Sequence, residues 1–127
     1  MSQFMNTENA AQPYGAYSHA VEAGDLIFIS GHSGRDVKTG KVIEGDIEAQ
    51  VVRAIENIAA VLKACRSSLD EVVRTTVYLA DMSDFQRMDA EYAKFFPRGF
   101  PARSTIQVAA LPFGARVALD AIAHRRR

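Results

Sequence analysis

The sequence has no excess of charge of either sign and no long apolar run. Lysine and arginine together number 15, as do aspartate and glutamate, so the formal net charge is zero. Such a balance gives no electrostatic reason to expect a nucleic acid as partner. No run of 18 or more apolar residues occurs, so we expect no membrane-spanning segment and no membrane partner.

Cysteine is nearly absent. Cys65 stands alone, which excludes an intramolecular disulfide framework. The first residues have neither the basic start nor the apolar core of a secretory signal. We therefore expect a reduced, cytoplasmic protein in which Cys65 is a small, unreactive apolar residue. The three histidines show no metal-ligand spacing with one another or with Cys65, so we expect no metal site.

What the chain does have is the make-up of an ordinary globular domain. Its 127 residues are 48% hydrophobic and 24% charged, which is enough to build a sizeable core. We find no internal repeat, low-complexity tract or linker, and therefore expect a single domain over residues 1–127.

Hydrophobic periodicity predicts the elements of the first half of the chain. After about a dozen irregular residues, the runs 17–22 and 26–30 flank a Gly-Asp turn and are typical of a hairpin. Asp46 is placed to cap a helix. Apolar side chains then recur at spacings of three and four, which puts them on one helix face: Ile47, Val51, Ile55, Ile58 and Leu62.

The second half predicts one more helix and three more strands. Residues 72–79 are rich in β-branched side chains and favour a strand. Ser83 and Gln86 form a capping-box pattern that opens a helix, and Pro97 stops it. Two closing strands are expected over 104–108 and 116–124. This order predicts an α+β fold with two helices packed on one face of a single sheet.

Two charged side chains stand out because they sit in strands. Arg103 follows a turn-forming Phe-Pro-Ala and shares its strand face with Thr105. Asp120 lies in mid-strand among alanine, leucine and isoleucine, where acidic residues are rare. An ion pair between Arg103 and Asp120 that ties two strands together would account for both. The residue pattern alone favours this ion pair, and a site in which Arg103 receives an anionic ligand is the alternative.

Eight segments in order along the chain form a recognisable set. They are GAYSHAV (15–21), FISGHSG (28–34), AIENIAAVL (54–62), VVRTTVYLADMSDF (72–85), YAKFF (92–96), FPARST (100–105), VAALP (108–112) and VALDAIAH (117–124). This set, which spans nearly the whole chain, resembles the RidA/YjgF family, the reactive intermediate (enamine/imine) deaminases. The PARS segment and the closing AIA strand are its most specific parts.

The resemblance implies a small chorismate-mutase-like fold assembled as a homotrimer, with a ligand cleft at each subunit interface. The residue pattern is compatible with this assembly. An antiparallel sheet with helices on one face leaves the other face uncovered, and here that face is rich in valine, isoleucine, leucine and alanine. Three such faces that meet around an axis would bury it in a closed cyclic assembly.

The resemblance also implies an activity. The matching arginine, Arg103, would hold the carboxylate of a small 2-imino or 2-enamino acid such as 2-aminoacrylate, and water would convert it to a 2-oxo acid and ammonia. Asp120 would be the acid–base carboxylate. The same pocket would be lined by Tyr17, Ser30 and Gly31, with a backbone hydrogen bond near Thr105. No cofactor is implied, since the reaction also proceeds in water alone.

The chain departs from the family pattern at four places. Asp120 stands where the best-known deaminases carry glutamate, Thr105 replaces a cysteine and Asp89 replaces an asparagine. His32-Ser33-Gly34 stands in place of the commoner Gln-Ile-Pro. These changes leave open a second function, that of a non-deaminating member which binds a small carboxylate or hydrolyses another C–N bond. Some relatives have been described as ribonucleases, a function that the charge balance does not favour.

Overall fold

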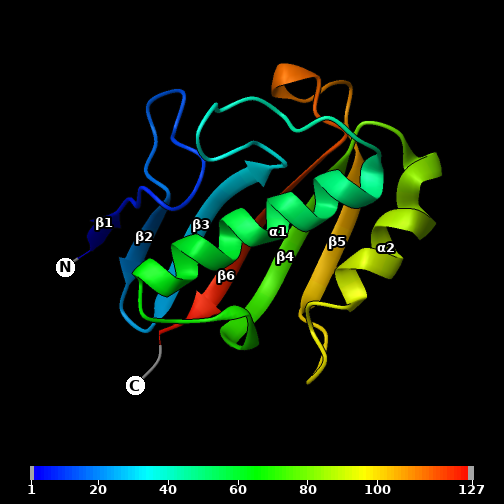
Figure 1. Ribbon diagram of the computed structural model, residues 1–127. Helices are drawn as coiled ribbons and strands as arrows, with labels where there is room; N and C mark the ends of the chain where they lie inside the picture. The colour runs from blue at the N-terminus through cyan, green and yellow to red at the C-terminus, as the bar shows by residue number, and fades with distance from the viewer. Residues whose placement is uncertain (1, 126–127) are drawn as a thin grey trace.

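A computed structural model describes residues 2–125 and shows one six-stranded sheet with two helices on one of its faces (Figure 1). The predicted plan is therefore confirmed. The strands lie in the order β1-β2-β3-β6-β4-β5. The elements are β1 (Gln3–Met5), β2 (Ala20–Ala23), β3 (Leu26–Ser33), α1 (Ile47–Ala64), β4 (Val72–Leu79), α2 (Phe85–Ala93), β5 (Ala102–Gln107) and β6 (Val117–His124).

The sheet is mixed, and its one parallel pair sits at an edge. β4 and β5 run parallel, while every other neighbouring pair is antiparallel. A parallel pair needs a crossover connection, and α2 provides it between β4 and β5. As a result α2 is held close to the start of the edge strand β5 (Figure 1).

α1 forms as its apolar spacing predicts. The carboxylate of Asp46 accepts a hydrogen bond from the backbone N–H of Ala49 at 3.2 Å, so the expected cap is present. The predicted apolar face is buried against the sheet, with Ile47, Val51 and Leu62 fully enclosed. No helix in residues 2–125 is long and apolar enough to cross a membrane.

The start of α2 differs from the prediction. Ser83 and Gln86 do not form a capping box; instead the carboxylate of Asp81 accepts from the backbone N–H of Ser83 at 2.9 Å. This contact opens a single 3-10 turn over Met82–Asp84, and the α-helix begins only at Phe85. Asp81 takes this N–H because it is the cap residue directly before the turn, and its short side chain reaches forward to the N–H two residues on.

The N-terminal segment is more ordered than its sequence suggests. Residues 3–5 form β1, which pairs with β2, and β2 begins at Ala20 rather than at Tyr17. The cause is His19, which is fully buried. Its Nδ1 accepts from the N–H of Thr7 at 3.1 Å and its Nε2 lies 2.8 Å from the carbonyl of Ala11. The ring therefore anchors a loop where the composition predicts a strand.

The two faces of the sheet differ sharply. On β6, Val117, Leu119, Ala121 and Ala123 share one face and are buried beneath the helices. The opposite face carries exposed apolar side chains, among them Phe28 and Ile106, each more than two-fifths exposed. We call the face opposite the helices the open face.

Candidate functional site

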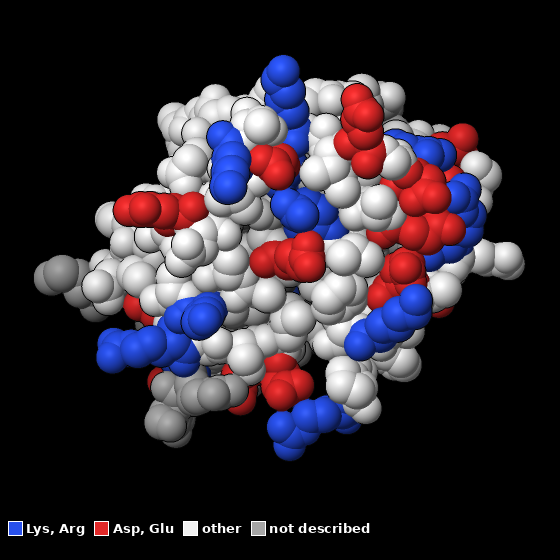
Figure 2. Space-filling model, in the orientation of Figure 1, with Lys and Arg blue, Asp and Glu red and all other residues white. Residues whose placement is uncertain are grey.

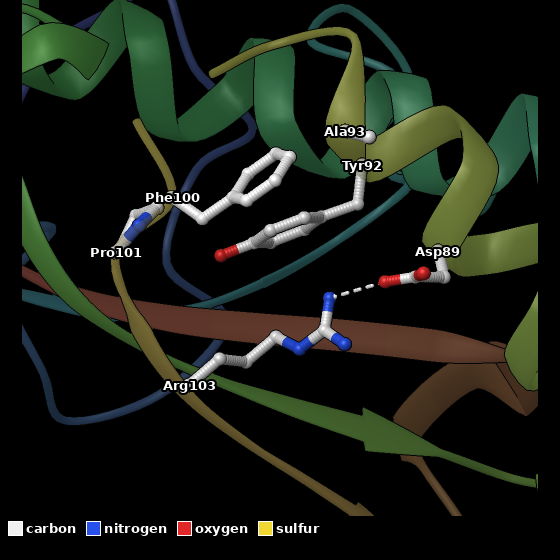
Figure 3. Close-up of a pocket in the computed structure, with 6 residues that line it drawn as sticks. All are labelled: Asp89, Tyr92, Ala93, Phe100, Pro101 and Arg103. Carbon is white, nitrogen blue, oxygen red and sulfur yellow. Dashed lines mark hydrogen bonds and ion pairs between the residues drawn. The ribbon is translucent and has the colours of Figure 1, made fainter. Parts of the chain in front are cut away.

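A cavity of about 320 Å³ lies between α2 and the start of β5 (Figure 3). Helix α2 contributes Asp89, Tyr92 and Ala93, and the turn that leads into β5 contributes Phe100 and Pro101. Arg103 completes the lining. The cavity is at the small end of the range for ligand pockets, and it joins one cation, one anion and two aromatic rings.

Arg103 is held on three sides. Its Nη1 donates a hydrogen bond to Oδ1 of Asp89 at 2.7 Å. Its guanidinium lies 4.8 Å from the centroid of the Tyr92 ring and 5.5 Å from that of Phe85. Figure 3 shows the guanidinium beneath the Tyr92 ring and aimed at Asp89. Cation–π contacts of this kind fix a guanidinium plane while leaving its remaining donors available.

Tyr92 lines this cavity and is held in one position. Its hydroxyl lies 2.7 Å from Oγ1 of Thr75 on β4, and the residue is almost fully buried. Burial raises the pKa of the phenol above its ordinary value, so Tyr92 is neutral at physiological pH. It supports Arg103 through its ring face rather than through charge.

Arg103 and Asp120 do not form an ion pair, so the strand-tying alternative is wrong for this chain. Arg103 lies beside Thr75 in the parallel register, and Asp120 lies opposite Thr76 in the antiparallel one. Side chains of laterally paired residues share a face, and successive residues alternate. Arg103 therefore points to the helix side of the sheet and Asp120 to the open face.

Asp120 has its own surroundings on the open face. Its Oδ2 accepts a hydrogen bond from the hydroxyl of Tyr78 at 2.7 Å. This bond, followed by partial burial and the charge of Asp120, raises the pKa of Tyr78. Tyr78 therefore stays a neutral donor and orients the Asp120 carboxylate.

A β-bulge brings Ser30 and Gly31 next to Asp120. Ile29 pairs with Ala121 and His32 pairs with Leu119, so two residues of β3 face the single residue Asp120 on β6. Bulges of this kind re-aim side chains and concentrate near functional sites. Ser30 is held by its hydroxyl, which donates to the carbonyl of Ser18 at 2.7 Å. A glycine inside a strand, here Gly31, is the sequence signal that indicates such a bulge.

The expected site residues thus fall into two groups within one chain. Arg103 and Thr105 lie on the edge strand β5, while Ser30, Gly31 and Asp120 meet at the bulge. Tyr17 lies before β2, where its hydroxyl accepts from the N–H of Tyr14 at 3.3 Å. β6 and β4 separate β3 from β5, a distance of about 14 Å. A single chain does not bring the groups together.

One of the three histidines, His32, is buried near the bulge, a position that the sequence did not predict. His32 is 5% exposed, and its Nε2 has no hydrogen-bond partner among the described residues. Its ring lies 5.5 Å from that of His19. Burial, then the charges of His19 and Arg35, lower the pKa of His32 from 6.5 to about 4. His32 is therefore neutral at physiological pH and borders a small cavity of about 90 Å³ that Gly31 also lines.

On the helix side of the molecule, acidic and basic side chains alternate (Figure 2). Several of them form ion pairs: Arg87 contacts Asp46 and Glu48, and Arg53 contacts Glu56. The face in Figure 2 carries no continuous basic surface of the kind that follows a nucleic-acid backbone.

Comparison with known proteins places these features in a family. The family model described as endoribonuclease L-PSP matches residues 7–125. A RutC family protein of Pyrococcus horikoshii is 42% identical over 98% of this chain and 99% of its own length. The 2-iminobutanoate/2-iminopropanoate deaminase of mouse is 40% identical over 94% of this chain and 88% of its own length.

Solved structures give the same result. The YjgF gene product of E. coli superposes with a TM-score of 0.92 at 36% identity, over 98% of this chain and 99% of that one. TdcF of E. coli, solved with bound serine, also gives a TM-score of 0.92, at 31% identity and with the same coverage of both chains.

Proposed function

The chain belongs to the RidA/YjgF family, and from this premise we propose that it is a deaminase of small reactive 2-imino and 2-enamino acids. Its substrates would be compounds such as 2-aminoacrylate, and its products a 2-oxo acid and ammonia. The proposal includes no cofactor, and it places the protein in the cytoplasm on account of its single cysteine.

The observation that carries the proposal is the state of Arg103. Its guanidinium is held in a small cavity by one hydrogen bond and two aromatic rings, and a planar fork of donors suits a carboxylate. Two findings on relatives support the same reading. The mouse relative is named an imine deaminase, and the E. coli TdcF structure contains serine, which carries an α-carboxylate.

For this reaction the protein has to supply only the positioning of the substrate and the transfer of a proton. For 2-iminopropanoate, CH₃–C(=NH₂⁺)–COO⁻ and H₂O become CH₃–CO–COO⁻ and NH₄⁺. Water forms a C–O bond to the imine carbon, a proton moves from oxygen to nitrogen, and the C–N bond then breaks. Arg103 would hold the carboxylate so that the imine carbon faces water, and an acid–base group would move the proton.

The second half of the site would come from a neighbouring subunit. Arg103 sits on β5, whose outer edge pairs with no strand among residues 2–125, and Asp120 with the Ser30-Gly31 bulge lies on the open face. Exposed apolar side chains on that face, including Phe28 and Ile106, favour burial against another copy. We propose a homotrimer in which Arg103 of one subunit meets Ser30, Gly31, Tyr17 and Asp120 of the next.

Asp120 is the acid–base group of this proposal. Tyr78 orients its carboxylate, and Ser30 and Gly31 of the bulge face it from β3. A water molecule between Asp120 and the imine carbon would lose its proton to the carboxylate, which would return it to the leaving nitrogen. Because aspartate is one methylene shorter than glutamate, its reach is about 1.5 Å less.

A coupled assay tests the function. A serine dehydratase generates 2-aminoacrylate, and the decay of this product is followed with and without the protein. We expect faster decay with the protein, loss of most of the effect in Asp120→Asn, and retained carboxylate binding in that variant. Asp120→Glu should maintain or raise the rate.

Arg98→Ala is the matched control, since Arg98 is an exposed arginine that contacts only Asp70 among the described residues. It should leave the decay rate unchanged. Equal decay with and without the protein contradicts the deaminase proposal, and carboxylate binding in that case would support the non-deaminating alternative. A wild-type rate in Asp120→Asn shows that this carboxylate is structural.

A further inference from the structure

The cavity beside α2 presents two opposite charges side by side. Arg103 enters it from β5 and Asp89 from α2, and they touch through a single hydrogen bond of 2.7 Å between Nη1 and Oδ1. Arg103 has a side chain 20% exposed, and Asp89 one 47% exposed. Both groups are therefore within reach of a small molecule in the cavity.

Each partner keeps capacity for a further contact. Within residues 2–125, Nε and Nη2 of Arg103 donate no hydrogen bond and Oδ2 of Asp89 accepts none. A guanidinium has five N–H donors, and a carboxylate accepts at both of its oxygens. The pair thus offers a donor edge and an acceptor oxygen next to each other, which is the pattern of a zwitterion binding site.

We propose that Asp89 accepts a hydrogen bond from the positively charged nitrogen of the substrate while Arg103 holds its carboxylate, so that the cavity selects zwitterions. This inference rests on the proposed function of the same site. In a 2-iminio acid, as in an amino acid, the nitrogen and the carboxyl carbon are bonded to the same atom and lie about 2.5 Å apart. Adjacent opposite charges on the protein match adjacent opposite charges on the ligand.

The rest of the cavity fits a short side chain. Phe100 is 70% exposed, and it stands with Tyr92 and Pro101 along one side of the cavity (Figure 3). These groups offer apolar contact and no further charge. A methyl or ethyl group on the substrate would lie against them, while a second carboxylate would find no partner there.

Asp89 also has a consequence for the chemistry. A negative charge close to an imine nitrogen favours its protonated form. The protonated imine has the more electrophilic carbon, so this is the form that water attacks. Asp89 would therefore keep the substrate reactive, whereas an amide at the same place would only orient it.

A simpler role for Asp89 is to position Arg103 and nothing more. The two roles differ in one measurable property. If Asp89 only orients the guanidinium, its loss weakens every carboxylate ligand by the same factor. If Asp89 binds the nitrogen, its loss weakens a zwitterion and relieves the repulsion of a plain anion.

The test compares L-alanine with propionate, which differ by the α-ammonium group alone and do not react. Their dissociation constants are measured by calorimetry or by NMR titration for the unmodified protein and for Asp89→Asn. We expect the unmodified protein to bind L-alanine more tightly. Asp89→Asn should reduce that preference roughly 10-fold or more and bind propionate at least as tightly as before.

Glu91→Gln is the matched control. Glu91 lies on the same helix, pairs with Lys94 and does not line the cavity, so its change alters the net charge equally without touching the site. It should leave the preference unchanged. An equal loss for both ligands in Asp89→Asn, an unchanged preference, or no preference in the unmodified protein overturns the proposal.

These outcomes are separable from those of the turnover assay. A protein that prefers L-alanine through Asp89 but does not speed the decay of 2-aminoacrylate has the zwitterion site and is not a deaminase. A protein that speeds the decay and shows no preference is a deaminase in which Asp89 has no such role.

Discussion

At the scale of the residue, Arg103 is held in place before any ligand arrives. Its contacts with Asp89, Tyr92 and Phe85 fix the guanidinium, which lowers the entropy that a ligand must remove on binding. The sequence left two roles open for Arg103, an ion pair with Asp120 and a ligand site, and the structure separates them. The arginine does not tie strands through Asp120, and its one charged partner among the described residues comes from a helix.

The role of Arg103 can be tested by replacing it. Arg103→Ala should abolish turnover and carboxylate binding while the protein stays folded, because the guanidinium meets the ligand rather than the core. Arg103→Lys should lose nearly as much, since an ammonium cannot reproduce the planar fork. Turnover and binding are measured with the melting temperature. A large drop in melting temperature with ligand affinity preserved would instead assign the arginine to stability.

His32 makes the stability depend on pH. Its pKa is about 4 in the folded protein and 6.5 in the unfolded chain, so below pH 6.5 the unfolded chain binds the proton more readily. The contribution of the neutral His32 ring to the free energy of unfolding is fully present above pH 6.5 and is lost as the pH falls toward 4. At pH 4.5 the loss attributable to His32 is about 2 to 3 kcal/mol.

His32→Gln tests this dependence, because the amide does not titrate. Urea unfolding is compared at pH 7 and pH 4.5 for both proteins at one concentration. The unmodified protein should lose more free energy of unfolding than the variant does. The same loss in both would show that other groups, and not His32, cause the acid sensitivity.

At the scale of the element, two local irregularities position the site residues. The bulge of β3 places Ser30 and Gly31 opposite Asp120, and the 3-10 turn at Asp81 sets where α2 starts. α2 carries both Asp89 and Tyr92. The way in which this helix packs beside β5 therefore sets where these side chains stand relative to Arg103.

The cap of this turn gives a prediction. Asp81→Ala should lower the urea midpoint, because its carboxylate accepts from the N–H of Ser83. That hydrogen bond, together with one from the Ser83 hydroxyl, holds the pKa of Asp81 below its usual value, so the same stabilisation fades as the pH falls toward that pKa. Gln86→Ala is the comparison, and it should leave the midpoint unchanged. A larger drop in the urea midpoint for Gln86→Ala than for Asp81→Ala would show that Ser83 and Gln86 form the capping box after all.

At the scale of the whole molecule, one chain holds the two groups of candidate site residues apart. Arg103 lies at the unpaired edge of the sheet and Asp120 on the open face. An assembly that covers the open face would bury its apolar side chains and could bring the two groups of candidate site residues together. Both effects would follow from covering the same face, because that face is uncovered in the single chain and is lined by candidate site residues.

The assembly can be measured directly. We expect a homotrimer, with a mass in sedimentation three times the chain mass of 13.9 kDa. Phe28→Asp should weaken it, since Phe28 is exposed on the open face opposite Ile122. Met82→Asp, an equivalent change at an exposed position on the turn before α2, should not. A monomer at micromolar concentration would refute both the trimer and the cleft between subunits.

Taken alone, the sequence determined the elements and the family. The spacing of Ile47, Val51 and Leu62 predicted α1, and the residue pattern over 116–124 predicted the closing strand, because both patterns are local consequences of backbone geometry. The order of elements then predicted helices on one face of a sheet. The segments around Arg103 and Asp120 resembled one family, which the comparisons confirmed.

Only the tertiary structure decided which of these residues meet. That Arg103 and Asp120 face opposite sides follows from the registers of β5 and β6 on β4, and register depends on pairing across the whole sheet. Asp89 reaches Arg103 because a crossover packs α2 beside β5, and His19 and His32 are buried only once the chain has folded. Such contacts join residues far apart in the chain, so no local pattern of side chains encodes them.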